Sequence, residues 1–135
     1  MENTTEQILD FLNRNRRELI RFLIALVKAE SPTTEPVAVE ALFRQIGKAF
    51  EELDYHCLYR KGKTSAGQLL IRPNGRPEGP YQLLLGHCDT VWPVGTLREM
   101  PVEMHENILR GPGVYDMKAG IAQIFYSLRT LQALG

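Results

Sequence analysis

Apolar residues recur every three or four positions over the N-terminal part of the chain, with charged residues between them. This spacing predicts an amphipathic helix from Thr4 to about Glu30, bent near "NRNRR" at residues 13–17. Thr4 with Gln7 three residues later would form a capping box. "SPTTEP" ends the helix, and Pro36 at a first helical position is expected to start a second one. The inner side of that second helix carries Val39, Leu42, Phe43, Ile46, Phe50 and Leu53.

The hydrophobic period changes after Asp54. "YHCLYR", "QLLIR" and "YQLLLGH" predict three strands, separated by turns that contain glycine and proline. The run Leu83-Leu84-Leu85 is apolar on both faces, so the third strand is expected at the centre of a sheet, covered by helices. "VEMHENILRG" predicts a short hairpin that turns at "HEN", and Met117 to Leu134 has helical spacing. This order of elements predicts an α/β fold, a layered sheet with flanking helices.

Composition and charge limit the classes of protein to which this sequence can belong. The 135 residues are enough for one domain, and sixteen basic and sixteen acidic residues cancel. No cluster of Lys and Arg lies among aromatic residues, so no nucleic-acid partner is expected. No run approaches 18 apolar residues and the N-terminus lacks a signal-peptide pattern, so we expect a soluble, cytoplasmic chain with no membrane partner. Cys57 and Cys88 form no CxxC pair, which fits a reduced compartment without proving one.

The stretch "LLLGHCDTV", residues 83–91, places a histidine and an aspartate two positions apart at the end of the third predicted strand. Side chains two apart in an extended segment share a face, so His87 and Asp89 should point one way and Cys88 the other. Asp89 could accept a hydrogen bond from one imidazole nitrogen and leave the lone pair of the other for a metal. The pair could also be a structural hydrogen bond with no metal.

A second carboxylate follows in "RGPGVYDMKAG", residues 110–120, where Asp116 lies between a Gly-Pro-Gly loop and the last predicted helix. Gly111 and Gly113 can take positive φ and bring backbone close to a ligand, and the helix dipole would keep a carboxylate here ionised. Asp116 could also be only an N-cap, and Lys118 only a surface residue. The order and spacing of the two motifs carry more information than either motif alone.

Together, "LLLGHCDTV", "PVGT" and "RGPGVYDMKAG" resemble the N-terminal part of the M20 zinc metallopeptidases, in particular their glutamate-carboxypeptidase-like branch, with acetylornithine deacetylase and succinyl-diaminopimelate desuccinylase as relatives. The resemblance covers essentially the whole chain, including the "ESP" after the first helix. It implies that His87 is a ligand of one zinc and that Asp116 bridges two zincs. It implies a catalytic-site role for Asp89, which supports His87, and a cis peptide between Asp116 and Met117.

The activity that the resemblance implies is hydrolysis of an amide bond in short peptides or N-acyl amino acids. Two zinc ions, for which cobalt or manganese could substitute, activate a water, and a glutamate acts as general base. The family supplies this glutamate from a Glu-Glu pair downstream of the bridging aspartate, followed by another acidic ligand and a final histidine. No Glu, Asp or His follows Asp116 here. Glu51 and Glu52 precede His87 and are expected to be solvated charges at a helix end, and neither His56 nor His105 is expected to be a ligand.

The sequence therefore predicts that residues 1–135 form a partial catalytic domain, without the dimerisation or lid domain that the family inserts later and without its C-terminal part. Such a segment is expected to bind zinc weakly and to be inactive alone. It is expected to self-associate, as a homo-oligomer, through exposed sheet edges. Two alternatives stay open. One is a non-catalytic truncated homologue that acts as a binding or assembly module, and the other is a flavodoxin-like or Rossmann nucleotide binder, against which the lack of a GxGxxG motif counts.

Overall fold

The computed structural model describes residues 3–75 and 78–135. Within these residues the fold is mixed α/β, with four α-helices and two antiparallel two-stranded sheets. The elements are α1 (Thr4–Arg14), α2 (Arg16–Lys28), α3 (Pro36–Glu51), β1 (Tyr55–Arg60), β2 (Gln68–Pro73), a 3-10 turn (Thr96–Arg98), β3 (Glu103–His105), β4 (Ile108–Arg110), a π-helical turn (Val114–Lys118) and α4 (Ala119–Leu134). Of the described helices, none has the length and apolar character to cross a bilayer.

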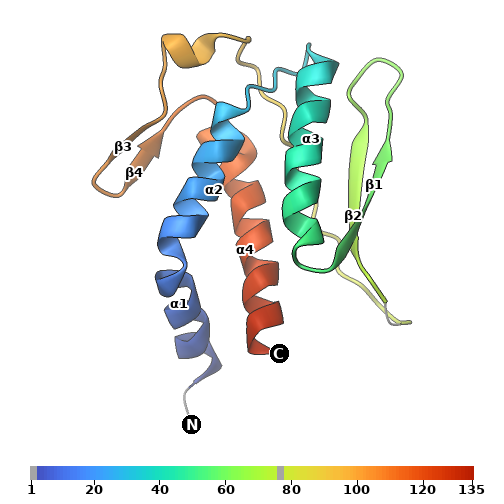
Figure 1. Cartoon of the computed structure of the whole chain (residues 1–135), viewed down its shortest axis with the longest axis vertical. Helices are drawn as coiled ribbons and strands as arrows, with labels where there is room; N and C mark the ends of the chain where they lie inside the picture. The colour runs from blue at the N-terminus through green and yellow to red at the C-terminus, as the bar shows by residue number, and fades with distance from the viewer. Residues whose placement is uncertain (1–2, 76–77) are drawn as a thin grey trace.

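The helices lie side by side and the two hairpins flank them (Figure 1). α1 and α2 follow one another as a bent rod, and α4 packs along both. α3 lies on the other side of α4, and the β1–β2 hairpin packs against α3. The β3–β4 hairpin lies at the opposite edge of the molecule, beside α2. The chain therefore has one helical layer with a small sheet at each side.

The helix boundaries follow the sequence closely. The predicted bend near residues 13–17 is confirmed, because α1 and α2 are separated at Asn15. α3 begins at Pro36, as predicted. The predicted capping box is wrong: Asn3 is the N-cap of α1, and its side chain accepts a hydrogen bond from the Thr5 N–H at 3.2 Å. Thr4 already lies inside the helix, because the preceding asparagine supplies an equally good capping oxygen.

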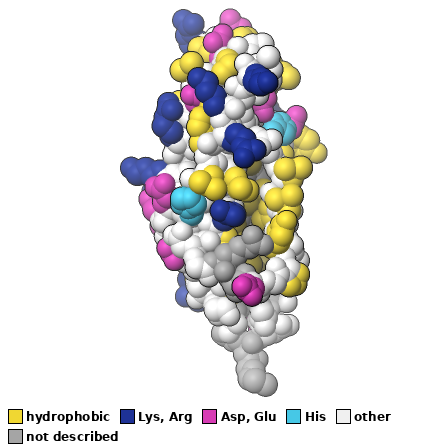
Figure 2. Space-filling model, turned by 90° about the vertical axis from the view of Figure 1, so that its right-hand side faces the viewer, with side chains coloured by type: hydrophobic (Ala, Val, Ile, Leu, Met, Phe, Trp, Pro, Cys, Tyr) yellow, Lys and Arg dark blue, Asp and Glu magenta, His cyan; other side chains and the backbone are white. Residues whose placement is uncertain are grey.

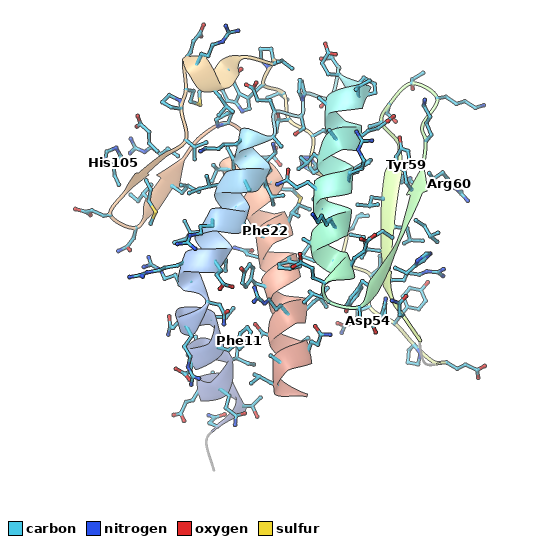
Figure 3. The ribbon with its side chains drawn as sticks, in the orientation of Figure 1. Phe11, Phe22, Asp54, Tyr59, Arg60 and His105 are labelled. Atoms are coloured by element: carbon cyan, nitrogen blue, oxygen red, sulfur yellow. The ribbon has the colours of Figure 1, made fainter. Side chains whose placement is uncertain are left out.

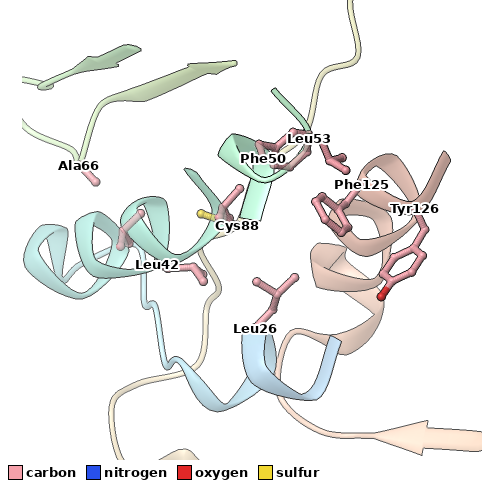
Figure 4. Packing of buried hydrophobic residues seen from close by; sticks show 10 residues of the cluster. Leu26, Leu42, Phe50, Leu53, Ala66, Cys88, Phe125 and Tyr126 are labelled. Atoms are coloured by element: carbon pink, nitrogen blue, oxygen red, sulfur yellow. The ribbon is translucent and has the colours of Figure 1, made fainter. Parts of the chain in front are cut away.

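The main core lies between α2, α3 and α4, with aromatic rings at its centre (Figure 4). Leu26 of α2 and Leu42 of α3 are fully buried. The Phe125 ring of α4 lies 4.8 Å from Phe22 of α2 and 5.2 Å from Phe50 of α3, measured between centroids. Figure 3 shows Phe22 on the side of α2 that faces α4. These contacts hold the three helices in fixed relative positions.

The predicted hairpin in "VEMHENILRG" is confirmed, and the first two predicted strands are present and form a hairpin of their own. β1 and β2 pair antiparallel, with Cys57 opposite Ile71. β3 and β4 also pair antiparallel, with His105 opposite Ile108. The second hairpin turns at Glu106, whose φ of 52° lies in the left-handed region. Each hairpin forms from neighbouring segments, so local alternation and turn residues suffice to predict it.

The predicted third strand at Leu83–Leu85 is wrong, and with it the layered sheet. The segment has no strand assignment, and residues 82–86 form no backbone hydrogen bond with the described part of the chain. The side chains of Leu83, Leu84 and Leu85 are 68%, 53% and 84% exposed. An apolar pattern indicates that a segment could form a buried strand, but a strand also needs a neighbouring strand to which its backbone can hydrogen-bond. In the described residues neither two-stranded sheet extends to this segment.

Candidate metal centre

The segment that carries His87 is held by the connection between α2 and α3. Thr90 donates its N–H to the Ser31 carbonyl at 2.8 Å, and Thr33 donates its N–H to the Thr90 carbonyl at 2.9 Å. These bonds form a short parallel bridge between Pro32 and Thr90. The Ser31 hydroxyl also donates to the Cys88 carbonyl at 2.8 Å. The backbone is thus fixed immediately after His87.

Side chains alternate along this segment as predicted. Cys88 points into the core (Figure 4) and is 4% exposed, and burial raises the pKa of its thiol to about 12. The side chains of His87 and Asp89 lie on the outer side, 47% and 31% exposed. Cys88 therefore anchors the segment in the core, and its two neighbours remain available for chemistry.

Two glycines allow the His87 segment to approach the start of α4. A Cβ atom at Gly86 would lie 3.1 Å from Met117 Cε. A Cβ atom at Gly113 would lie 2.5 Å from Thr90 Cγ2, and the φ of Gly113 is 73°. Only glycine fits this second position without displacing Thr90. These close contacts bring the two motifs of the sequence together.

Asp116 lies in the π-helical turn before α4. Its φ of −122° and ψ of 100° are not helical, and α4 begins at Ala119 with Lys118 as its N-cap. The interpretation of Asp116 as an N-cap is therefore wrong. The peptide bond between Asp116 and Met117 is cis, as the resemblance implies.

The three predicted site residues meet around one imidazole ring. His87 Nε2 lies 2.8 Å from Asp116 Oδ1. On the other side of the ring, Nδ1 lies 3.1 Å from the Asp89 carbonyl oxygen and 3.3 Å from Asp89 Oδ1. His87 thus links a carboxylate on each side. The structure brings all three residues together, and their roles toward a metal stay predictions.

Two opposing effects set the protonation of His87. Partial burial lowers the pKa of the imidazole, but hydrogen bonds to Asp116 and Asp89, with the charges of both carboxylates, outweigh burial and raise it. Both ring nitrogens face acceptors, so the protonated ring satisfies both at once. A metal ion at Nε2 would have to displace that proton, because metal-binding imidazole is neutral.

Lys118 is the main departure from the predicted site. Its side chain is 1% exposed, so the interpretation as a surface residue is wrong. The ammonium group donates to the Ala29 carbonyl at 2.8 Å, at the end of α2. Burial lowers the pKa of Lys118 to about 8, against the smaller raising effects of Cys88 and Glu30. Lys118 thus ties the turn that carries Asp116 to the helix before the α2–α3 connection.

Glu30 organises the loop that follows His87. Both carboxylate oxygens accept from the Gly95 N–H at 2.9 Å, and Oε1 also accepts from the Leu97 N–H at 3.0 Å. The bonds from Leu97 and Gly95 lower the pKa of Glu30. This contact joins the "ESP" and "PVGT" motifs, which the sequence shows only as separate stretches.

The donor set fits part of a zinc site. Histidine and aspartate are both zinc ligands, and two atoms bound to one tetrahedral zinc lie roughly 3.4 Å apart. The Nε2 and Oδ1 atoms, at 2.8 Å, would reach that separation by a small movement. Asp89 faces the opposite side of the ring and cannot share a metal with Asp116 at Nε2. Accordingly, the described residues contain no group of three or more His, Cys, Asp or Glu side chains that could hold a metal ion.

The remaining acidic and histidine candidates lie elsewhere. Glu51 and Glu52 are exposed at the end of α3, and His56 is exposed on β1. His105 is exposed on the β3–β4 hairpin (Figure 3), 3.6 Å from Glu103. All four are solvent-facing.

Sequence reasoning missed Thr33, whose hydroxyl donates to Asp89 Oδ2 at 2.6 Å. It also missed Glu30 as a loop anchor and Lys118 as a buried group. All three depend on contacts between residues far apart in the sequence: Lys118 with the end of α2, and Thr33 and Glu30 with the segment that follows His87. The available signals were the presence of "ESP", which contains Glu30, and of "RGPGVYDMKAG", which contains Lys118, among the stretches that resemble the family.

Comparison with known proteins agrees with the resemblance. Residues 83–135 match the sequence model of peptidase family M20/M25/M40. The chain is also 28% identical over 119 residues to carboxypeptidase G2 of Pseudomonas sp. (strain RS-16). That match covers 87% of this chain and 28% of carboxypeptidase G2, so the chain spans about a quarter of its relative's length. His87 lies near the start of the region that matches the family, and Asp89 and Asp116 lie within it.

Proposed function

We propose that this chain, whose residues 83–135 match the sequence model of peptidase family M20/M25/M40, is the N-terminal part of the catalytic domain of a zinc-dependent hydrolase. In this proposal the parent protein cleaves an amide bond in a short peptide or an N-acyl amino acid. The family is generally zinc-dependent. The observation that carries the proposal is the meeting of His87 Nε2 and Asp116 Oδ1 at 2.8 Å, across 29 residues of sequence.

The proposed roles follow from the arrangement around the imidazole. Nε2 of His87 and the Asp116 carboxylate would bind zinc, and Nδ1–H of His87 would donate a hydrogen bond to Asp89, which would orient the ring. Zinc bound there would supply a Lewis acid that polarises a carbonyl and lowers the pKa of a water. Asp116 is 79% exposed, so a second metal or a substrate could approach its other oxygen.

The metal-binding part is tested by measuring Zn²⁺ affinity of the purified chain in competition with a chromophoric chelator. His87→Ala and Asp116→Asn should each weaken binding by more than about tenfold, since even residues that only support a ligand change affinity by 10- to 100-fold. His105→Ala is the matched control, because His105 is exposed on the β3–β4 hairpin. Equal affinity in His87→Ala and wild type would contradict the proposed site.

The hydrolytic part is tested by the coding sequence beyond Gly135. A downstream Glu-Glu pair and a later histidine would supply the missing general base and ligands, and the protein containing them should hydrolyse N-acyl amino acids or dipeptides. A stop codon directly after Gly135 would contradict catalysis by this chain. It would favour the second candidate, a non-catalytic module, which the incomplete donor set among the described residues also supports.

A further inference from the structure

The connection between α2 and α3 contains a threonine in direct contact with the proposed centre. We propose that Thr33 is a positioning residue, which fixes the Asp89 carboxylate and through it the orientation of the His87 imidazole. The inference rests on the proposed metal site at His87 and Asp116. It adds a residue from a different element, outside the region that matches the family.

Thr33 is tied to the segment after His87 by its backbone and by its side chain. The backbone N–H donates to the Thr90 carbonyl at 2.9 Å, which fixes the position of Thr33 independently of Asp89. The hydroxyl lies 2.6 Å from Asp89 Oδ2 and 3.2 Å from the Thr90 carbonyl oxygen. A hydroxyl has one hydrogen, and a bond to a carboxylate is shorter and stronger than one to a neutral carbonyl. The hydroxyl therefore donates to Asp89.

This bond leaves one orientation for the Asp89 carboxylate. With Oδ2 held by Thr33, Oδ1 stays on the side of His87, 3.3 Å from Nδ1. Oδ1 thus joins the Asp89 carbonyl oxygen, 3.1 Å from Nδ1, as a second acceptor on that side of the ring, which favours the hydrogen on Nδ1 against the competing acceptor Asp116 at Nε2. The Asp89 side chain is 31% exposed, so without the hydroxyl its carboxylate could turn toward water.

Three variants separate the hydroxyl from the rest of the residue. Thr33→Val keeps the shape and the backbone bond but removes the hydroxyl, and Thr33→Ser keeps the hydroxyl. Thr34→Val is the matched control, because Thr34 is also exposed and its side chain forms no hydrogen bond within the described residues.

The first measurement uses the metal-free chain. Nitrogen-15 spectra of the imidazoles, recorded at a pH where His87 is neutral, report which ring nitrogen keeps the hydrogen. Thr33→Val should lower the share of the Nδ1–H form, whereas Thr33→Ser and Thr34→Val should match wild type. Equal shares in Thr33→Val and wild type would overturn the inference. If Thr33→Val acted only by loosening the fold, Thr33→Ser would not restore the wild-type share of the Nδ1–H form.

The second measurement uses Zn²⁺ alone as the probe. Thr33→Val should weaken affinity by about three- to tenfold, less than the loss of a group in direct contact with a ligand. If His87→Ala abolishes binding and Thr33→Val equals wild type, the inference on Thr33 fails and the proposed site stands. If His87→Ala binds zinc like wild type, the proposed site fails, and the tautomer measurement alone decides on Thr33.

Discussion

Replacing Lys118 with methionine should change how the stability of the chain depends on pH. Burial lowers the pKa of Lys118 from 10.5 to about 8 in the folded chain. The charged form is therefore disfavoured by folding, and this penalty is present in full below pH 8. It disappears as the pH rises toward 10.5, because the unfolded chain then releases its proton too. Between pH 7 and pH 9.5 wild type should gain about 2 kcal/mol from this one group.

Urea unfolding of wild type and Lys118→Met at pH 7 and pH 9.5 measures this gain as a difference of differences. Titrating groups that do not interact with Lys118 contribute equally to both proteins and cancel. The free energy of unfolding of wild type should rise by about 2 kcal/mol relative to the variant between the two pH values. Lys63→Met, at an exposed lysine between β1 and β2, should run parallel to wild type. Parallel curves for Lys118→Met and wild type would refute the reasoning.

Two further predictions concern the loop anchor and the exposed leucines. Glu30→Gln should lower the free energy of unfolding by about 1–3 kcal/mol at neutral pH, because it weakens the charge-assisted bonds to the loop. The pKa of Glu30 is lowered in the folded chain, so this contribution should fade as the pH falls through the titration of Glu30. Glu35→Gln is the exposed control, and an unchanged urea midpoint for Glu30→Gln would contradict the prediction. Hydrophobic side chains gather along one edge of the face in Figure 2, and the exposed, unpaired segment at Leu83 and Leu85 should mediate self-association. Light scattering should then show a smaller mean mass for the Leu83→Lys, Leu85→Lys double variant than for Leu9→Lys, and equal masses would contradict this.

Local patterns explain which elements the sequence predicts. α3 begins at Pro36 and the β3–β4 hairpin turns at Glu106 because neighbouring residues decide both features. The alternation of His87, Cys88 and Asp89 also follows from the chain itself, since any extended segment turns successive side chains to opposite sides. In each case the determinants lie within a few residues.

Features that depend on contacts between residues far apart in the sequence are the ones that sequence patterns leave undecided or predict wrongly. The apolar run at Leu83–Leu85 cannot show whether another strand lies beside it, and none does within the described residues. A lysine after a glycine-rich loop suggests solvent exposure, and only the packing of α2 against the turn at Lys118 buries it. The contact of Thr33 with Asp89 spans 56 residues of sequence. Such long-range contacts can be identified only from the folded structure.

Zinc titration of the nitrogen-15-labelled chain, followed at the imidazole nitrogens, tests the proposed centre most directly. The chain has three histidines, His56, His87 and His105, so each ring can be followed separately. The account predicts that Zn²⁺ shifts Nε2 of His87 and leaves its Nδ1 protonated toward Asp89, with His56 and His105 unchanged. Coordination through Nδ1, or a response confined to His56 or His105, would contradict it.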